Sequence, residues 1–196
     1  MIRKIQSREE LEKKRERNNK IMVIVLGLIL LLSTAGYFVS DYTGSKNPTV
    51  TYKNIKFEQS EYGYWVFQIN NHDYGTRFMP EETVNVSIIA EKALGEYSGK
   101  VLYFASPGSK DYSEQAKTEI MNNLYGIVSK ENFACLDESC LEDYPIKNCS
   151  ENNLILFQRS ETNRVSSQDK CIIIEYQDGQ ADLVADAFIF RILGLQ

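Results

Sequence analysis

An uncharged, mostly apolar run near the N-terminus constrains this chain more than any other feature. Residues 21–39 (IMVIVLGLILLLSTAGYFV) contain no charged side chain. As an α-helix, this run extends about 28 Å, which is close to the thickness of the hydrocarbon layer of a bilayer. The run therefore predicts a single transmembrane helix that anchors the chain in a lipid bilayer.

The charges on either side of the run predict its orientation. Residues 1–20 carry eight basic and four acidic side chains, whereas the rest of the chain has a net charge of -9. Basic flanks stay in the cytoplasm, so we expect a cytoplasmic leader at 1–20 and a C-terminal domain outside the cell membrane. The acidic outer part also excludes nucleic acid as a partner, because binding phosphates needs clustered positive charge.

A cleaved signal peptide is the alternative to this signal-anchor. The most apolar part of the run, residues 21–32, is short, and Ser33, Thr34 and Ala35 provide small residues where a signal peptidase cuts. In that case the domain is secreted. The long charged leader and the apolar residues that continue to position 39 favour an uncleaved anchor.

The rest of the chain predicts one α+β domain at 50–196, after a polar linker at 40–49. Strand patterns alternate or run apolar at 50–57, 62–69, 74–79, 101–105, 154–157 and 171–176. Helical periodicity follows at about 111–129 and again after Gly179, ending at Gly194. The order of these elements predicts a mixed or antiparallel sheet with two helices.

Several segments resemble one group of proteins. These segments are the charged leader, LSTAGYFV, WVFQINNHDYGTRFMPEE, PIKNC, DKCIIIEY and ADAFIFRILGL. Together they are similar to uncharacterised single-pass membrane proteins of small-genome archaea. The resemblance implies the same topology and a compact extracytoplasmic domain, and it transfers no catalytic residue.

All four cysteines lie after the apolar run. They are Cys135, Cys140, Cys149 and Cys171. An even number outside the membrane predicts two disulfides, and we favour Cys135 with Cys140 and Cys149 with Cys171. A zinc site is the alternative, but the spacings match no familiar tetrathiolate pattern.

The turn between the apolar strand at 101–105 and the next helix is a candidate ligand-binding site. Free N–H groups at a helix N-terminus favour an anion. The candidate residues are Ser106, Gly108, Ser109 and Lys110. The spacing of a phosphate-binding loop is missing, so an ordinary strand-to-helix turn is the competing interpretation.

Other polar residues carry less specific signals. Asp178, Asp182 and Asp186 at the last helix could hold a cation, but acidic residues at this position usually complement the helix N-terminus, so we assign no metal and no cofactor. His72 is interpreted as a residue of a solvated turn. Asn85 and Asn148 begin glycosylation motifs, the second of which contains Cys149.

These observations predict no catalytic residue. The first functional hypothesis is a membrane-anchored, non-enzymatic domain that binds a protein or an envelope component, with the aromatic side chains of Tyr62, Tyr64 and Trp65 as a binding face for a glycan or a protein. The alternative is a membrane-anchored enzyme or anion-binding protein that uses the turn from Ser106 to Lys110.

Overall fold

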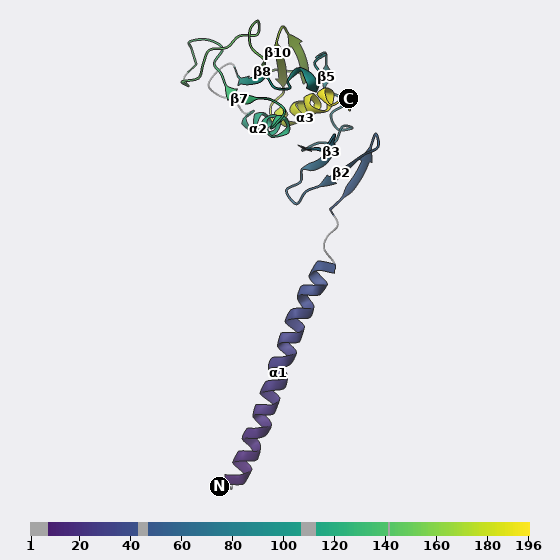
Figure 1. Ribbon diagram of the computed structural model, residues 1–196, viewed down its shortest axis with the longest axis vertical. Helices are drawn as coiled ribbons and strands as arrows, with labels where there is room; N and C mark the ends of the chain where they lie inside the picture. Colours follow the sequence, from purple (N-terminus) through teal and green to yellow (C-terminus); the bar gives the residue numbers. More distant parts are fainter. Residues whose placement is uncertain (1–7, 43–46, 107–112, 141) are drawn as a thin grey trace. The chain divides into compact units, whose positions relative to one another are not determined.

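The computed structural model describes residues 8–42, 47–106, 113–140 and 142–196 (Figure 1). Within the first of these ranges, it describes the side chains of residues 12, 13 and 15–30. The chain divides into two compact units, Met1–Lys46 and Asn47–Gln196.

The first unit is built on one long helix, α1 (Arg8–Tyr42). The charged leader and the apolar run are parts of this same helix, and its described apolar side chains, such as Ile24 and Leu30, are exposed. Among the described residues, none of the helices combines the length and the apolar character that a membrane crossing needs. The crossing by residues 21–39 therefore stays a prediction.

The second unit begins with an antiparallel sheet whose strands follow one another in chain order. Its four strands in the described residues are β1 (Thr49–Tyr52), β2 (Ile55–Gln59), β3 (Trp65–Ile69) and β4 (His72–Thr76). Two of its turns have two residues each, Lys53–Asn54 and Asn70–Asn71, all with positive φ. Such turns match the twist of a hairpin, and asparagine tolerates this backbone conformation better than most residues.

The other sheet is mixed. In the described residues, its six strands lie in the order β5 (Ser87–Ile88), β9 (Arg164–Gln168), β10 (Cys171–Tyr176), β8 (Leu154–Arg159), β6 (Val101–Ala105) and β7 (Lys130–Phe133). The strands β7, β6, β8 and β10 are parallel, while β9 is antiparallel to β10. A short 3-10 helix, η1 (Leu94–Glu96), precedes β6.

Two helices lie between the sheets (Figure 1). They are α2 (Glu114–Leu124) and α3 (Ala181–Ile192). Both pack on the six-stranded sheet, and Phe190 of α3 also packs on Phe57 and Phe67 of the four-stranded sheet. Most residues of α3 are therefore buried, although Arg191 is exposed, which explains why its sequence is mostly apolar.

The structure confirms the α+β class with helices and a mixed sheet, and it adds a second sheet. The predicted strands at 101–105 and 171–176 are β6 and β10. The single run expected at 50–57 is instead a hairpin of β1 and β2, and the strands β7 and β9 are not predicted by the sequence pattern. The helix expected up to about residue 129 ends at Leu124.

Candidate functional site

A groove lies between the edge of the four-stranded sheet and helix α2. Its volume is about 610 Å³. Tyr64 and strands β3 and β4 form one wall, and the N-terminal three turns of α2 form the other. The lining residues are Tyr64, Val66, Asp73, Tyr74, Gly75, Glu114, Gln115, Thr118, Glu119, Asn122 and Asn123.

The wall formed by β4 is the edge of its sheet, and Asn123 of α2 closes this edge. The Gly75 N–H donates to Asn123 Oδ1, and Asn123 Nδ2 donates to the Gly75 carbonyl, each at 2.8 Å. A side-chain amide offers the same donor and acceptor as a peptide group. Asn123, which is 3% exposed, therefore takes the place of a neighbouring strand.

His72 also joins β4 to α2, so its interpretation as a solvated turn residue is wrong. It is the first residue of β4, and its ring lies 4.6 Å from the Tyr74 ring. Its Nε2 lies 3.2 Å from the Asn123 carbonyl oxygen. Because a carbonyl oxygen only accepts, Nε2 carries the proton in this contact.

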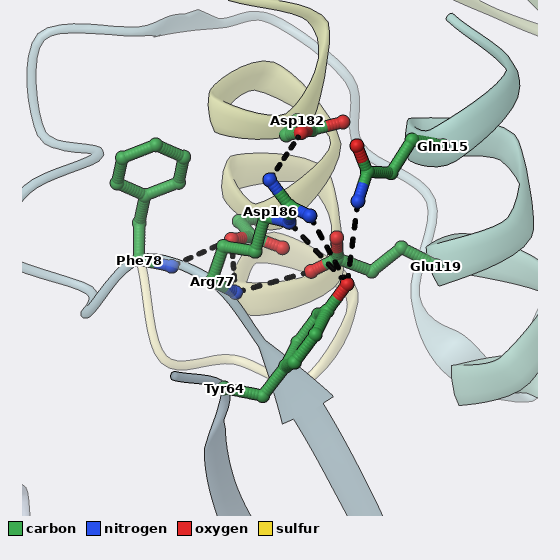
Figure 2. A network of polar contacts seen from close by, with 7 residues as sticks. All are labelled: Tyr64, Arg77, Phe78, Gln115, Glu119, Asp182 and Asp186. Carbon is green, nitrogen blue, oxygen red and sulfur yellow. Dashed lines mark hydrogen bonds and ion pairs between the residues drawn. The ribbon is translucent and has the colours of Figure 1, made fainter. Parts of the chain in front are cut away.

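Beyond β4, two buried carboxyl groups hold the backbone of residues 77 and 78 (Figure 2). Asp186 Oδ2 accepts hydrogen bonds from the N–H groups of Arg77 and Phe78, each at 2.9 Å. Glu119 Oε1 accepts from the same Arg77 N–H at 3.2 Å. Helices α2 and α3 thus each contribute one carboxyl group to the same stretch of chain.

The second oxygen of each carboxyl group is buried as well. Among the described residues, Glu119 Oε2 and Asp186 Oδ1 have no donor. Burial raises the pKa of Asp186 well above its usual range, and the neighbouring Glu119 raises this pKa further. Burial also raises the pKa of Glu119, while its hydrogen bond with Asp186 lowers it. Both carboxyl groups therefore hold a proton to a higher pH than an exposed carboxyl group does, and Asp186 does so most strongly.

An arginine links this pair to the rim of the groove. Arg77 Nη1 lies 3.2 Å from Asp182 Oδ2, and its Nε and Nη2 each lie 3.3 Å from the Tyr64 hydroxyl oxygen. The guanidinium also lies 5.3 Å from the centre of the Tyr64 ring, and Gln115 Nε2 lies 3.5 Å from the same hydroxyl (Figure 2). These contacts fix the orientation of an aromatic ring at the groove.

The charged side chains among the described lining residues of the groove are carboxyl groups. Glu119 lines it, but one oxygen of Glu119 accepts from Arg77 and the other is buried beside Asp186. No lysine or arginine is among its described lining residues, whose ionisable side chains include Asp73 and Glu114. No described group of three or more acidic, histidine or cysteine side chains could hold a metal ion. This chemistry suits uncharged ligands better than anions.

The predicted anion-binding turn is described only at Ser106, since Gly108, Ser109 and Lys110 lie outside the described residues. Ser106 lines a second cavity of about 210 Å³ at the carboxyl ends of β6 and β7. Lys117 lines it too, but its ammonium lies 3.2 Å from Glu114 Oε1, and Glu142 adds another carboxylate. These acidic groups oppose an anion.

Both predicted disulfides are confirmed. Cys135 is bonded to Cys140, and Cys149 to Cys171. Cys135 and Cys171 are buried, and Cys171 packs with Leu154 on the face of the six-stranded sheet that is opposite to the helices. The zinc alternative is excluded for these four residues.

The remaining predicted residues lie on the surface. Asn85 and Asn148 are both exposed. Asn148 Oδ1 accepts from the Ser150 hydroxyl at 2.7 Å, within the motif whose middle residue, Cys149, is disulfide-bonded. The three acidic residues in and just before α3 lie apart: Asp178 pairs with Arg159, Asp182 with Arg77, and Asp186 lies beside Glu119.

Several residues that build the site carry no sequence signal. Glu119, Asn123 and Arg77 belong to no motif. Tyr64 lies in the predicted aromatic face, and Asp186, an acidic residue inside a mostly apolar helix, predicts a buried partner.

No protein-family model, no curated protein and no solved structure matches the chain. The resemblance to single-pass archaeal membrane proteins therefore stays a prediction.

Proposed function

We propose that the chain is a membrane-anchored, extracytoplasmic binding protein and that the groove between β4 and α2 is its binding site. The observation that carries the proposal is the Tyr64 ring, which Arg77 and Gln115 hold at the rim of a groove without a free catalytic group.

The anchor half of the proposal rests on the sequence. Residues 21–39 lack charge, and the basic residues before them favour a cytoplasmic N-terminus. The two disulfides support an oxidising compartment for the domain. The mass of the mature protein tests the anchor: an intact chain has 22.5 kDa, and loss of the first 35 residues would favour the secreted alternative.

The ligand half rests on the lining of the groove. An aromatic ring can pack on the apolar face of a sugar, while amide and hydroxyl groups beside it can bond to the sugar hydroxyls. In the groove, the ring is that of Tyr64, and the polar groups belong to Gln115, Thr118 and Asn122. Gly75 adds room, because nothing lies within 4 Å of the place where its side chain would be. We therefore infer that the ligand is a neutral glycan of the cell envelope.

The test is a binding titration of the full-length protein in detergent micelles with neutral oligosaccharides of glucose, mannose, galactose and N-acetylglucosamine. We expect Tyr64→Ala to weaken binding by roughly ten-fold, the effect of losing one aromatic contact. The matched control is Tyr62→Ala, because Tyr62 is 85% exposed and does not line the groove. Equal binding by both variants, or no binding of any neutral sugar, contradicts the proposal.

The enzyme or anion-binding alternative depends on the cavity that contains Ser106 and Lys117. Its support is the position at the carboxyl ends of two parallel strands, where ligands of α/β sheets commonly bind. Tight binding of inorganic phosphate that is lost in Lys117→Met would favour this alternative over the glycan site.

A further inference from the structure

The four-stranded sheet has a second edge, β1, that the described chain leaves open. Among the described residues, β1 pairs with β2 alone. Its sequence, TVTY, contains no charged residue and no proline, which are the usual devices that keep an edge from pairing with another strand.

The register shows which peptide groups of β1 point away from the sheet. Tyr52 is paired with Ile55 across the two-residue turn, and the Gln59 N–H donates to the Pro48 carbonyl at 2.9 Å. In an antiparallel pair, every second residue exchanges hydrogen bonds with its partner. Residues 50 and 52 exchange such bonds with β2, and the Pro48 carbonyl accepts one. The N–H and C=O groups of Thr49 and Thr51 therefore point to the open edge.

One side chain at this edge is only half covered. Val50 belongs to the same cross-strand row as Phe57, Phe67 and Tyr74, which are 0%, 2% and 3% exposed. Val50 itself is 41% exposed. A further strand paired with β1 would continue this row of side chains and cover Val50.

We propose that the open edge binds the β1 strand of a second copy of this chain, so that two four-stranded sheets join into one. In an antiparallel two-fold pairing centred on Val50, Thr49 of each copy lies opposite Thr51 of the other copy. These two threonine pairs are hydrogen-bonded, whereas Val50 lies opposite Val50 of the other copy in a pair without hydrogen bonds. The outward groups of one copy thus satisfy those of the other.

The composition of β1 favours a second copy as the occupant. A two-fold contact is self-complementary, so the surface must accept its own image. Here no charge of β1 meets a like charge, and threonine pairs with threonine on the outer face, which is a favourable cross-strand pair.

Cysteine crosslinking tests the register in the full-length protein in detergent micelles. The native cysteines are all in disulfides, so a new thiol reports on its own position. At a pair without hydrogen bonds the Cα atoms are about 4.5 Å apart, which a disulfide can span. We expect Val50→Cys to form a covalent dimer under mild oxidation.

The matched control is Thr51→Cys. Its equivalent in the other copy is a diagonal neighbour at about 7–8 Å, which is beyond the reach of a disulfide. Equal crosslinking at both positions would indicate random collision or association through another surface, and it would overturn the proposal. The same holds if neither variant crosslinks.

A second pair of variants tests the hydrogen bonds. Thr51→Pro removes an N–H that points outward and leaves the bonds to β2 in place, whereas Thr51→Val keeps it. Each dimer then loses two hydrogen bonds, so we expect roughly 30-fold weaker association, measured by light scattering, for the proline variant alone. If Thr51→Pro fails to fold, as judged by its thermal transition, the crosslinking experiment decides. Unchanged association of a folded Thr51→Pro overturns the proposal.

Discussion

The two edge strands of the four-stranded sheet, β4 and β1, differ in whether other parts of the chain bond to their outward peptide groups. At β4, Asn123 bonds the outward N–H and C=O groups of Gly75. Just beyond β4, Glu119 and Asp186 accept from the N–H groups of residues 77 and 78. At β1, the outward groups of Thr49 and Thr51 have no partner among the described residues. The β4 edge is closed because it lies on α2 and α3, which fold against the other sheet. The comparison shows that a side chain from a helix can bond to peptide groups at a sheet edge, as a neighbouring strand would. Among the described residues, the edge at β1 has no such bonds.

The largest expected effect is on the closed edge, with Asp186→Ala. This change leaves the half-buried Phe78 N–H without its acceptor and the Arg77 N–H with Glu119 alone. We expect a loss of about 3–5 kcal/mol in the free energy of unfolding, measured with urea. Asp178→Ala is the matched control, because that residue is 67% exposed in its side chain and pairs on the surface with Arg159. A loss no larger than in this control contradicts the closed edge.

The raised pKa values of Asp186 and Glu119 make the stability of this edge depend on pH. Because burial raises the pKa of Asp186 and Glu119, the folded protein holds more protons than the unfolded chain above about pH 4. Stability should therefore fall as the pH rises toward the pKa of Asp186 in the folded protein, by at most about 1.4 kcal/mol per pH unit. Asp182 and Arg77 are the other charged groups beside the pair, and both are present in the wild type and in the Asp186→Asn variant.

The measurement is urea unfolding between pH 4 and pH 9 for the wild type and Asp186→Asn. Asparagine keeps an acceptor for the backbone and a donor for Glu119 without a titrating proton. The difference in unfolding free energy between the two proteins should change with pH in favour of the variant as the pH rises. Parallel profiles would contradict a raised pKa of Asp186 in the folded protein.

Asn123→Ala removes the amide that completes β4. The N–H and carbonyl of the half-buried Gly75 lose their partners, so we expect the free energy of unfolding, measured with heat or urea, to fall by about 2–3 kcal/mol. Asn122→Ala is the control, because Asn122 is exposed, lines the groove and makes no bond to β4. Similar losses in both variants would mean that the amide of Asn123 does not close the edge.

The smallest effect on stability is expected at the open edge, with Val50→Lys. A lysine on an edge strand blocks pairing with another strand. The free energy of unfolding should change by less than about 0.5 kcal/mol, while association of the full-length protein is lost. Val66→Lys serves as the control, because Val66 is 40% exposed but lies on β3, away from the edge. Association that survives Val50→Lys places the contact elsewhere.

The elements with strong local signals are those that the sequence predicts. Strands β6 and β10 are continuous apolar runs, and α3 ends at Gly194, which has positive φ. Both disulfides follow from the number and position of the cysteines.

The missed elements owe their structure to tertiary contacts. The hairpin of β1 and β2 turns at Lys53 and Asn54, without the glycine that usually marks such a turn. Strand β9 has a single buried side chain, Val165, so it shows no apolar run.

The site could not be predicted for the same reason. Glu119 and Asp186 meet only because α2 and α3 pack side by side under the sheet, and their positions 67 residues apart give no local pattern. The sequence predicts that the acidic residues of α3 complement the N-terminus of the helix. Asp182 lies in the first turn, as this prediction requires, but Asp186 lies further along the helix and is buried.

Hydrogen exchange of two backbone amides, measured on the full-length protein in detergent micelles at several concentrations, tests the comparison most directly. The Gly75 amide should be protected at every concentration, because its acceptor belongs to the same chain. The Thr51 amide should be protected only at concentrations where the protein is dimeric, because its acceptor belongs to the second copy. Rapid exchange at Gly75, or protection at Thr51 that does not depend on concentration, would contradict the account.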